Sequence, residues 1–218
     1  MPTDNRTALL DLIATHSFKL GDFLLASGKR SDYYIDCRTT TLHAEGGRLA
    51  GLLLYDVIRE RIPQAVAVGG LTMGADPLVS NTASASAWAL ADYNEIRELS
   101  SALDLEEDDD PGPPPSLIQG FLVRKAEKTH GTGRRVEGFL KPGAQVVIVD
   151  DVCTTGGSTI TAIEAAREAG MVVAGVLCLV DREQGGRANI EAAAGDAPFI
   201  ALFTASDVRA AHIALAAG

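Results

Sequence analysis

Cysteine, aromatic side chains and long apolar runs are all scarce in this sequence. Three of its 218 residues are cysteine (Cys37, Cys153 and Cys178) and 5% are aromatic. Cysteines that are few, odd in number and far apart fit neither a disulfide framework nor a zinc site. No stretch reaches the roughly 20 apolar residues of a membrane helix; even the uncharged run 77–91 holds five Ser, Thr or Asn residues. The N-terminal MPTDNRTALLD has acids where a signal peptide has basic and apolar blocks, so we expect a location in the reducing cytoplasm.

Basic residues are also in the minority. The chain has 19 Lys and Arg against 29 Asp and Glu, a formal net charge of −10. A protein that binds nucleic acid through its overall charge is therefore unexpected, and we expect small-molecule partners without nucleic acid or membrane. The 46% hydrophobic and 22% charged residues are ordinary for a globular protein, and the length favours a single domain over 1–218.

Helical and strand-like patterns alternate along most of the chain. Apolar residues at helical spacing predict helices over residues 9–16, 49–57, 162–169 and 206–217. Short apolar runs predict buried strands over residues 65–68, 120–123, 145–149, 171–180 and 199–203. This alternation predicts an α/β fold with a mostly parallel, twisted sheet flanked by helices. Ligands of such sheets bind at the carboxyl ends of the strands, so four polar clusters should meet in one crevice: 69–74, 124–128, 150–158 and 181–182.

The pattern is interrupted over residues 80–119. Six of the seven residues 104–110 are acidic, and Pro-Gly-Pro-Pro-Pro follows at 111–115. Like charges repel and proline cannot donate a backbone hydrogen bond, so residues 104–116 are predicted to form a surface loop. The Ala- and Ser-rich part before them is compatible with a helix. We interpret 80–119 as an insertion into the domain.

The most informative segment is VVIVDDVCTTGGST, residues 146–159. Small residues between a strand and a helix let a ligand approach the backbone, and N–H groups at a helix N-terminus together with hydroxyls suit a phosphate. The paired carboxylates of Asp150 and Asp151 cannot hold a phosphate directly. They suit ribose hydroxyls, or Mg²⁺ through water. The segment is not a Walker loop, because no Lys follows the second Gly.

These residues resemble the phosphoribosyl pyrophosphate (PRPP) signature of the type I phosphoribosyltransferases. The resemblance implies that Asp150 and Asp151 are catalytic residues that hold the ribose. It also implies that PRPP contacts the residues that follow them: Val152, Cys153, Thr154, Thr155, Gly156, Gly157 and Ser158. Several enzymes and a few regulators share the signature, so it leaves the base open.

A basic segment gives an indication of which base is used. It is FLVRKAEKTHGTGRRVEG, residues 121–138. Its five Lys and Arg residues stand out in an acidic chain. The segment resembles the flexible loop of orotate phosphoribosyltransferases, in which a Lys and a His close over pyrophosphate. The resemblance implies PRPP binding by Arg124, Lys125, Lys128 and His130, of which Lys128 and His130 are also catalytic. In that family the loop reaches the neighbouring subunit's site, so we expect a homodimer with shared sites.

Three more segments resemble the same family. FLLASGKRSDYYIDCR (23–38) is similar to the stretch that places aromatic rings beside orotate, here Tyr34, within a small hood that we expect over residues 1–42. VGGLTMGADPL (68–78) is similar to the loop near the ribose and the pyrophosphate. VDREQGG (180–186) is similar to the segment whose Arg, here Arg182, binds the orotate carboxylate.

The family resemblance implies a reaction as well as a site. The enzyme would transfer the 5-phosphoribosyl group of PRPP to orotate with Mg²⁺, giving orotidine 5′-monophosphate (OMP) and pyrophosphate. Thr154 would contact the orotate together with Tyr34 and Arg182. Ala26 and Met73 stand where many members of the family have Lys. These two departures leave open a phosphoribosyltransferase for a purine or another base. Because regulators share the PRPP signature, a regulator of the same fold that binds nucleic acid also stays open.

Overall fold

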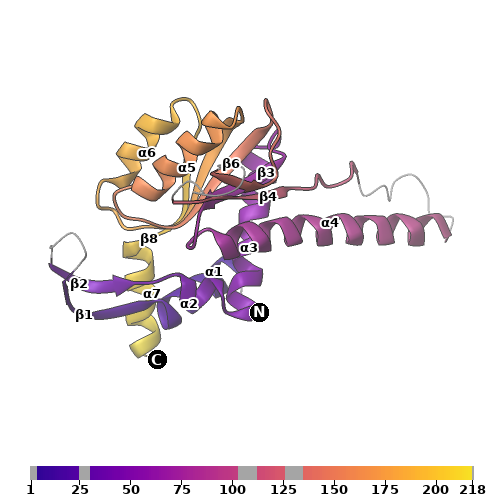
Figure 1. The fold of residues 1–218 in the computed structure, drawn as a ribbon. Helices are drawn as coiled ribbons and strands as arrows, with labels where there is room; N and C mark the ends of the chain where they lie inside the picture. The colour runs from indigo at the N-terminus through magenta and orange to yellow at the C-terminus, as the bar shows by residue number, and fades with distance from the viewer. Residues whose placement is uncertain (1–3, 25–29, 103–111, 126–134, 218) are drawn as a thin grey trace.

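A six-stranded sheet forms the centre of the molecule. The structure, a computed structural model, describes residues 4–24, 30–102, 112–125 and 135–217 (Figure 1). The sheet order is β5-β4-β3-β6-β7-β8, with parallel pairing except between β4 and β5. Its strands are β3 (Ala67–Leu71), β4 (Gln119–Val123), β5 (Val136–Gly138), β6 (Gln145–Cys153), β7 (Val172–Asp181) and β8 (Phe199–Thr204). The predicted fold class is confirmed.

Helices cover both faces of this sheet, which explains the continuous apolar runs of its strands. Val147 and Val149 of β6 belong to one core cluster, together with residues of α3 (Ala44–Arg61) and α4 (Asp76–Ala102). Val146 and Ile148 alternate with them and belong to a second cluster, with residues of α5 and α6. These two helices span Gly157–Glu168 and Gly186–Ala194.

A second, two-stranded sheet lies beside the main one, as Figure 1 shows near its lower edge. It pairs β1 (Phe18–Leu24) with β2 (Arg30–Ile35) in antiparallel fashion. Three helices accompany it: α1 (Asn5–His16), the short α2 (Arg38–Thr41) and α7 (Ala205–Ala217) at the other end of the chain. We refer to residues 4–24 and 30–42 of this region as the hood.

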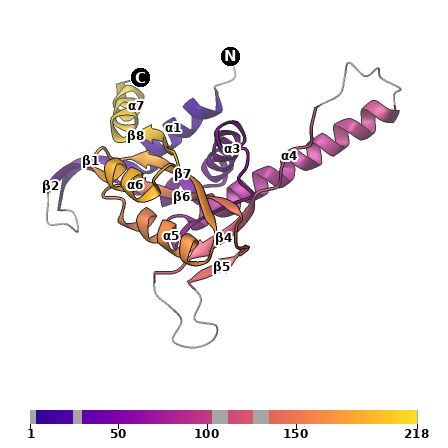
Figure 2. The ribbon, with the colours of Figure 1, turned by 90° about the horizontal axis from the view of Figure 1, so that it is seen from above.

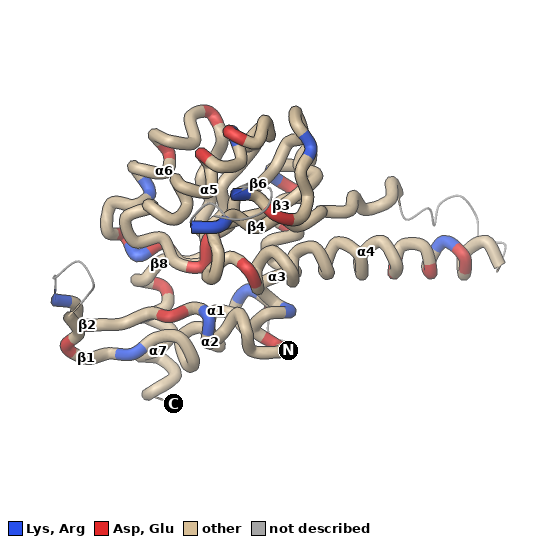
Figure 3. The backbone as a smooth tube through the Cα atoms, in the orientation of Figure 1, with Lys and Arg blue, Asp and Glu red and all other residues tan. Residues whose placement is uncertain are grey.

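Helix α4 extends into the first part of the proposed insertion. It runs for 27 residues and projects far from the sheet in two views (Figures 1 and 2). It includes 80–102, the part of the proposed insertion that was compatible with a helix. Figure 3 shows that its charged residues gather towards its far end. The acidic residues 104–110 lie outside the described residues. Neither α4 nor any other helix in the described ranges has the length and apolar character needed to cross a bilayer.

Candidate active site

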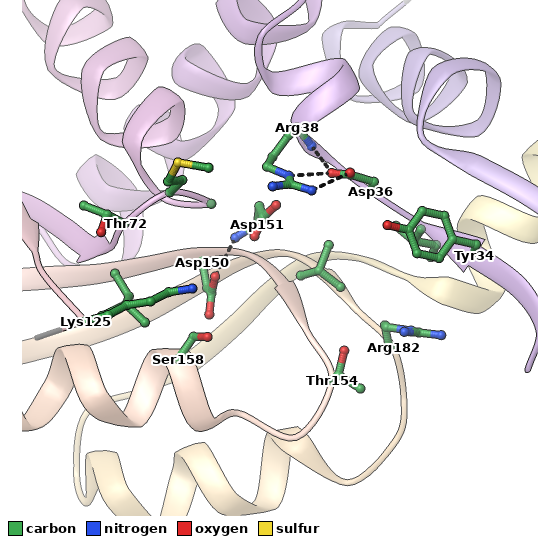
Figure 4. A pocket seen from close by; sticks show the side chains of 15 residues that line it. Tyr34, Asp36, Arg38, Thr72, Lys125, Asp150, Asp151, Thr154, Ser158 and Arg182 are labelled. Atoms are coloured by element: carbon green, nitrogen blue, oxygen red, sulfur yellow. Dashed lines mark hydrogen bonds and ion pairs between the residues drawn. The ribbon is translucent and has the colours of Figure 1, made fainter. Parts of the chain in front are cut away.

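A pocket of about 310 Å³ lies where the parallel strands of the sheet end. The residues after β3, β4, β6 and β7 contribute to it, so the four polar clusters meet as expected (Figure 4). Eight of its lining residues were predicted site residues: Tyr34, Lys125, Asp150, Asp151, Val152, Thr154, Ser158 and Arg182. The hood closes one side of the pocket through β2 and α2.

The acid pair Asp150 and Asp151 lies at the centre of this pocket (Figure 4). Asp150 is 6% exposed and accepts two hydrogen bonds, from the Thr159 hydroxyl at 2.7 Å and from the Asp151 backbone N–H at 3.0 Å. Thr159 in α5 therefore orients Asp150. Gly74 leaves room for the second acid, since a Cβ there would come within 2.4 Å of Asp151 Oδ1.

Burial raises the pKa of both carboxyl groups. Desolvation is the largest cause for each, and for Asp150 the negative charge of Asp151 adds to it. The hydrogen bond from Thr159 acts against the rise for Asp150. Asp150 is buried and Asp151 half-buried, and paired acids with raised pKa values are typical of functional sites.

The turn between β6 and α5 supplies hydroxyls and a helix N-terminus. Gly156 has φ +85°, a left-handed conformation that favours glycine, and it precedes the first turn of α5. Thr154 and Ser158 line the pocket. Cys153 is buried behind it, and Thr155, Gly156 and Gly157 form the turn without lining it. Backbone N–H groups at this helix end and two hydroxyls suit a phosphate.

Arg182 is a buried cation with unused hydrogen-bond donors. It lines the pocket and is 7% exposed, and its Nε and Nη2 have no partner in the described parts of the chain. Its guanidinium lies 4.9 Å from the ring centroid of Tyr33, which itself stacks on Phe18 at 5.5 Å. Tyr34, 41% exposed, lines the pocket from the same strand. A planar carboxylate is the ligand that satisfies a guanidinium fork best.

The basic segment is only partly described. Lys125 is exposed and lines the pocket, whereas Arg124 forms an ion pair with Glu137 at 2.9 Å and does not line it. Lys128 and His130 lie outside the described residues, as does Ala26.

Two charged lining residues, Asp36 and Arg38, were given no role by the sequence analysis. Arg38 Nε and Nη2 donate to the two carboxylate oxygens of Asp36 at 2.8 and 2.7 Å. The Asp-x-Arg spacing was a signal for such a pair, but nothing in the sequence placed it beside residues 150–151.

The pocket offers few ligands for a resident metal ion. Within the described ranges, no group of three or more His, Cys, Asp or Glu side chains could hold one. Two carboxylates beside a phosphate site do fit Mg²⁺ that arrives on a substrate, because Mg²⁺ keeps most of its water and binds through one or two carboxylates.

Comparison with known proteins decides the family. The family model described as "Phosphoribosyl transferase domain" matches residues 116–194. The chain is 41% identical over 189 residues to the orotate phosphoribosyltransferase of Aquifex aeolicus, covering 85% of this chain and 88% of that protein. It is 42% identical over 192 residues to the orotate phosphoribosyltransferase of Streptomyces avermitilis, covering 88% of this chain and 91% of that protein. The chain belongs to the orotate phosphoribosyltransferase family. Its reaction is the transfer of the phosphoribosyl group of PRPP to orotate, in pyrimidine biosynthesis.

Solved structures agree with this assignment. The orotate phosphoribosyltransferase of Mycobacterium tuberculosis in complex with PRPP is 28% identical and superposes with a TM-score of 0.67, over 94% of this chain and 99% of that one. The same enzyme in complex with Fe(III) dicitrate is 31% identical to this chain and superposes with a TM-score of 0.70. The superposition covers 94% of this chain and 99% of that one. The adenine phosphoribosyltransferase of Trypanosoma brucei is 15% identical and superposes with a TM-score of 0.59. The superposition covers 94% of this chain and 82% of that one. The fold is therefore shared with an enzyme for another base, and base choice depends on side chains.

The buried Asp150 leads to a prediction for the protein without ligand. We expect Asp150→Asn to raise its melting temperature at pH 8. A carboxyl whose folded pKa is raised contributes its stability below its ordinary value of 3.8, and this is lost as the pH rises through the raised value. Asparagine avoids that loss and can still accept a hydrogen bond. The melting temperature should rise by at least about 3 °C at pH 8 and by clearly less at pH 5.

Asp32→Asn is the matched control. Asp32 is exposed in the hood, and its hydrogen bond with Arg209 lowers its pKa, so its removal gives no gain at pH 8. If the Asp150 variant melted at or below the wild-type temperature at pH 8, our account of the buried acid would be wrong.

Proposed function

We propose that this pocket performs the orotate transfer with a division of labour in which Arg182 recognises the base. The observation that carries this proposal is the buried guanidinium of Arg182, two of whose donors have no partner in the described part of the chain. Orotate has a carboxylate, and a bidentate pair would satisfy both donors at once. Adenine, hypoxanthine, guanine and uracil have no carboxylate and would leave this charge buried and unpaired, at a cost of several kcal/mol. Tyr34 would lie beside the flat ring.

The sugar phosphate would be held from two ends. The turn before α5, with Thr154 and Ser158, would bind the 5′-phosphate, and Thr154 would also reach the base. Asp150 and Asp151 would accept hydrogen bonds from the ribose hydroxyls. Because the phosphate is held away from the reacting bond, its binding energy fixes the position of the anomeric carbon.

The remaining side of the pocket would take the pyrophosphate. Lys125 is the described cation there, and we assign Lys128 and His130 to the same group from the family resemblance. Arg124 would join them once its pair with Glu137 is exchanged for phosphate. Enzymes of this family use Mg²⁺ with PRPP. Bound through the pyrophosphate, and through water to Asp150 or Asp151, it would neutralise part of the leaving group's charge.

Catalysis would then be mainly electrostatic. As the anomeric bond stretches, the ribose gains positive charge, which the Asp150–Asp151 pair favours, and cationic side chains stabilise the departing pyrophosphate. The nucleophile is a ring nitrogen of orotate, so no covalent adduct with the protein is needed. The hood and the residues after the strands would limit access of water to the activated sugar.

The direct test is consumption of orotate with PRPP and Mg²⁺, followed against adenine, hypoxanthine, guanine, xanthine and uracil. We expect turnover of orotate alone, and its loss with EDTA. Turnover of a purine at a similar rate would favour the alternative of a purine phosphoribosyltransferase.

We also propose a homodimer in which the basic segment serves the neighbouring site. Mixing Lys128→Ala chains with Asp150→Asn/Asp151→Asn chains tests this arrangement. Random pairing of equal amounts should restore about a quarter of the wild-type activity, since half of the dimers then contain one intact site. No recovery after confirmed exchange of subunits would contradict shared sites.

Three free, buried cysteines support a cytoplasmic location.

A further inference from the structure

Arg38 presents an unused edge of its guanidinium to the pocket. Its Nε and Nη2 each donate to a different oxygen of Asp36, and the Asp36 carboxylate also accepts from the Arg38 backbone N–H at 3.1 Å. A guanidinium has five N–H donors, and this pairing uses two of them. Nη1 has no partner among the described residues, and the Arg38 side chain is 45% exposed. The pair therefore fixes the plane of the guanidinium and leaves its other edge available.

The position of Arg38 indicates which part of a ligand it would meet. Figure 4 shows Arg38 on the hood side of the pocket, above Asp151. A second, more apolar pocket shares three lining residues with this one: Asp36, Arg38 and Met73. Arg38 therefore lies at the boundary between the two pockets, on the side of residues 72–74. Hydrogen bonding with Asp36, and the nearby charge of Asp151, raise its pKa, so it stays charged.

The other anionic groups of the substrates already have partners under the proposed function. The 5′-phosphate lies at Thr154 and Ser158, and the orotate carboxylate lies at Arg182. What remains is the pyrophosphate, on the side of Lys125 and residues 72–74. A fixed guanidinium edge at this place suits two adjacent phosphate groups.

We propose that Arg38 binds the pyrophosphate of PRPP and the pyrophosphate product, and that Asp36 is the residue that positions it. This inference rests on the proposed function. The simpler interpretation is a surface ion pair at the start of α2. Such a pair would contribute little, and its loss would not distinguish pyrophosphate from the other ligands.

The experiment compares two ligands that contain pyrophosphate with one that lacks it. OMP carries the 5′-phosphate, the ribose and the orotate, whereas PRPP and free pyrophosphate engage the remaining side. For Arg38→Gln we expect the KM for PRPP, and the KM for pyrophosphate in the reverse reaction, to rise roughly ten- to a hundredfold. The Kd of OMP, measured by calorimetry, should stay within about twofold. Arg38→Lys keeps the positive charge but lacks the forked guanidinium, so its KM values should lie between those of the wild type and of Arg38→Gln.

Asp36 has its own readout. Asp36→Asn alone should raise the KM for pyrophosphate, and adding it to Arg38→Gln should cause no further rise, because the two residues act as one unit. Arg30→Gln is the matched control, since Arg30 is also a hood arginine paired with an aspartate, Asp22 at 2.9 Å, and does not line the pocket. The Arg30→Gln variant should leave the KM for PRPP, the KM for pyrophosphate and the Kd of OMP unchanged.

An unchanged KM for pyrophosphate in Arg38→Gln would overturn the proposal, as would an equal weakening of OMP. These outcomes are separate from a failure of the proposed function, which would appear as absence of orotate turnover in the wild-type protein. In that event, binding of magnesium pyrophosphate to the wild type and to Arg38→Gln still tests Arg38. Equal affinity would reject its role, and weaker binding by the variant would support it.

Discussion

Arg182→Met should lower kcat/KM for orotate by at least about a hundredfold, while the affinity for PRPP changes little. Removing one partner of a buried, hydrogen-bonded charge pair costs about 2–5 kcal/mol, and here the substrate carboxylate would lose its partner. The free protein should not be destabilised, because Nε and Nη2 of Arg182 have no hydrogen-bond partner among the residues that the structure describes. Steady-state kinetics with each substrate varied in turn, together with thermal melting, measure both effects.

Arg187→Met is the control for this prediction. Arg187 also lies over an aromatic ring, Phe199 at 4.7 Å, but it pairs with Asp181 and does not line the pocket. Its loss should leave the orotate constants within about twofold. A methionine at position 182 that preserved orotate turnover would reject the assignment of the base subsite.

Asp151→Asn should reduce kcat/KM for PRPP by about a hundredfold or more. The carboxylate would accept hydrogen bonds from the ribose and stabilise the positive charge that develops on it, and asparagine supplies no negative charge. Losses of this size are typical when one electrostatic contact to a transition state is removed. Steady-state rates, with a melting curve to confirm folding, provide the measurement.

Asp56→Asn offers a comparison within the same chain. Asp56 in α3 is another carboxyl whose pKa burial raises, and it does not line the pocket. It should retain wild-type kinetics. Activity of the Asp151 variant within threefold of wild type would mean that this acid has no role in the reaction.

The sheet and the centre of the site could be predicted because their signals are local. Each Val- or Ile-rich strand is followed directly by its polar cluster, so the parallel topology alone brings Asp150, Asp151 and Arg182 to one edge. The turn at Gly156 carries its own signal, since small residues there precede a helix. These features depend on neighbours in the sequence and on one general rule of α/β folds.

The contribution of the hood could not be predicted in the same way. Asp36 and Arg38 reach the pocket because the two-stranded sheet packs beside the strand ends, a tertiary contact without periodicity. The packing of Arg182 on Tyr33 joins residues 149 positions apart. Strand β5 has only three residues, and the far half of α4 has no clear apolar stripe, so neither gave a strong pattern.

The length of α4 affects how the assembly must be measured. At about 1.5 Å per residue, a helix of 27 residues extends for about 40 Å, and much of it stands clear of the globular part (Figure 2). An arm of this kind increases hydrodynamic drag without adding much mass. Elution volume from a sizing column would therefore overstate the molecular weight, and a single chain could pass for a pair. Light scattering or sedimentation equilibrium, which do not depend on shape, should count the subunits.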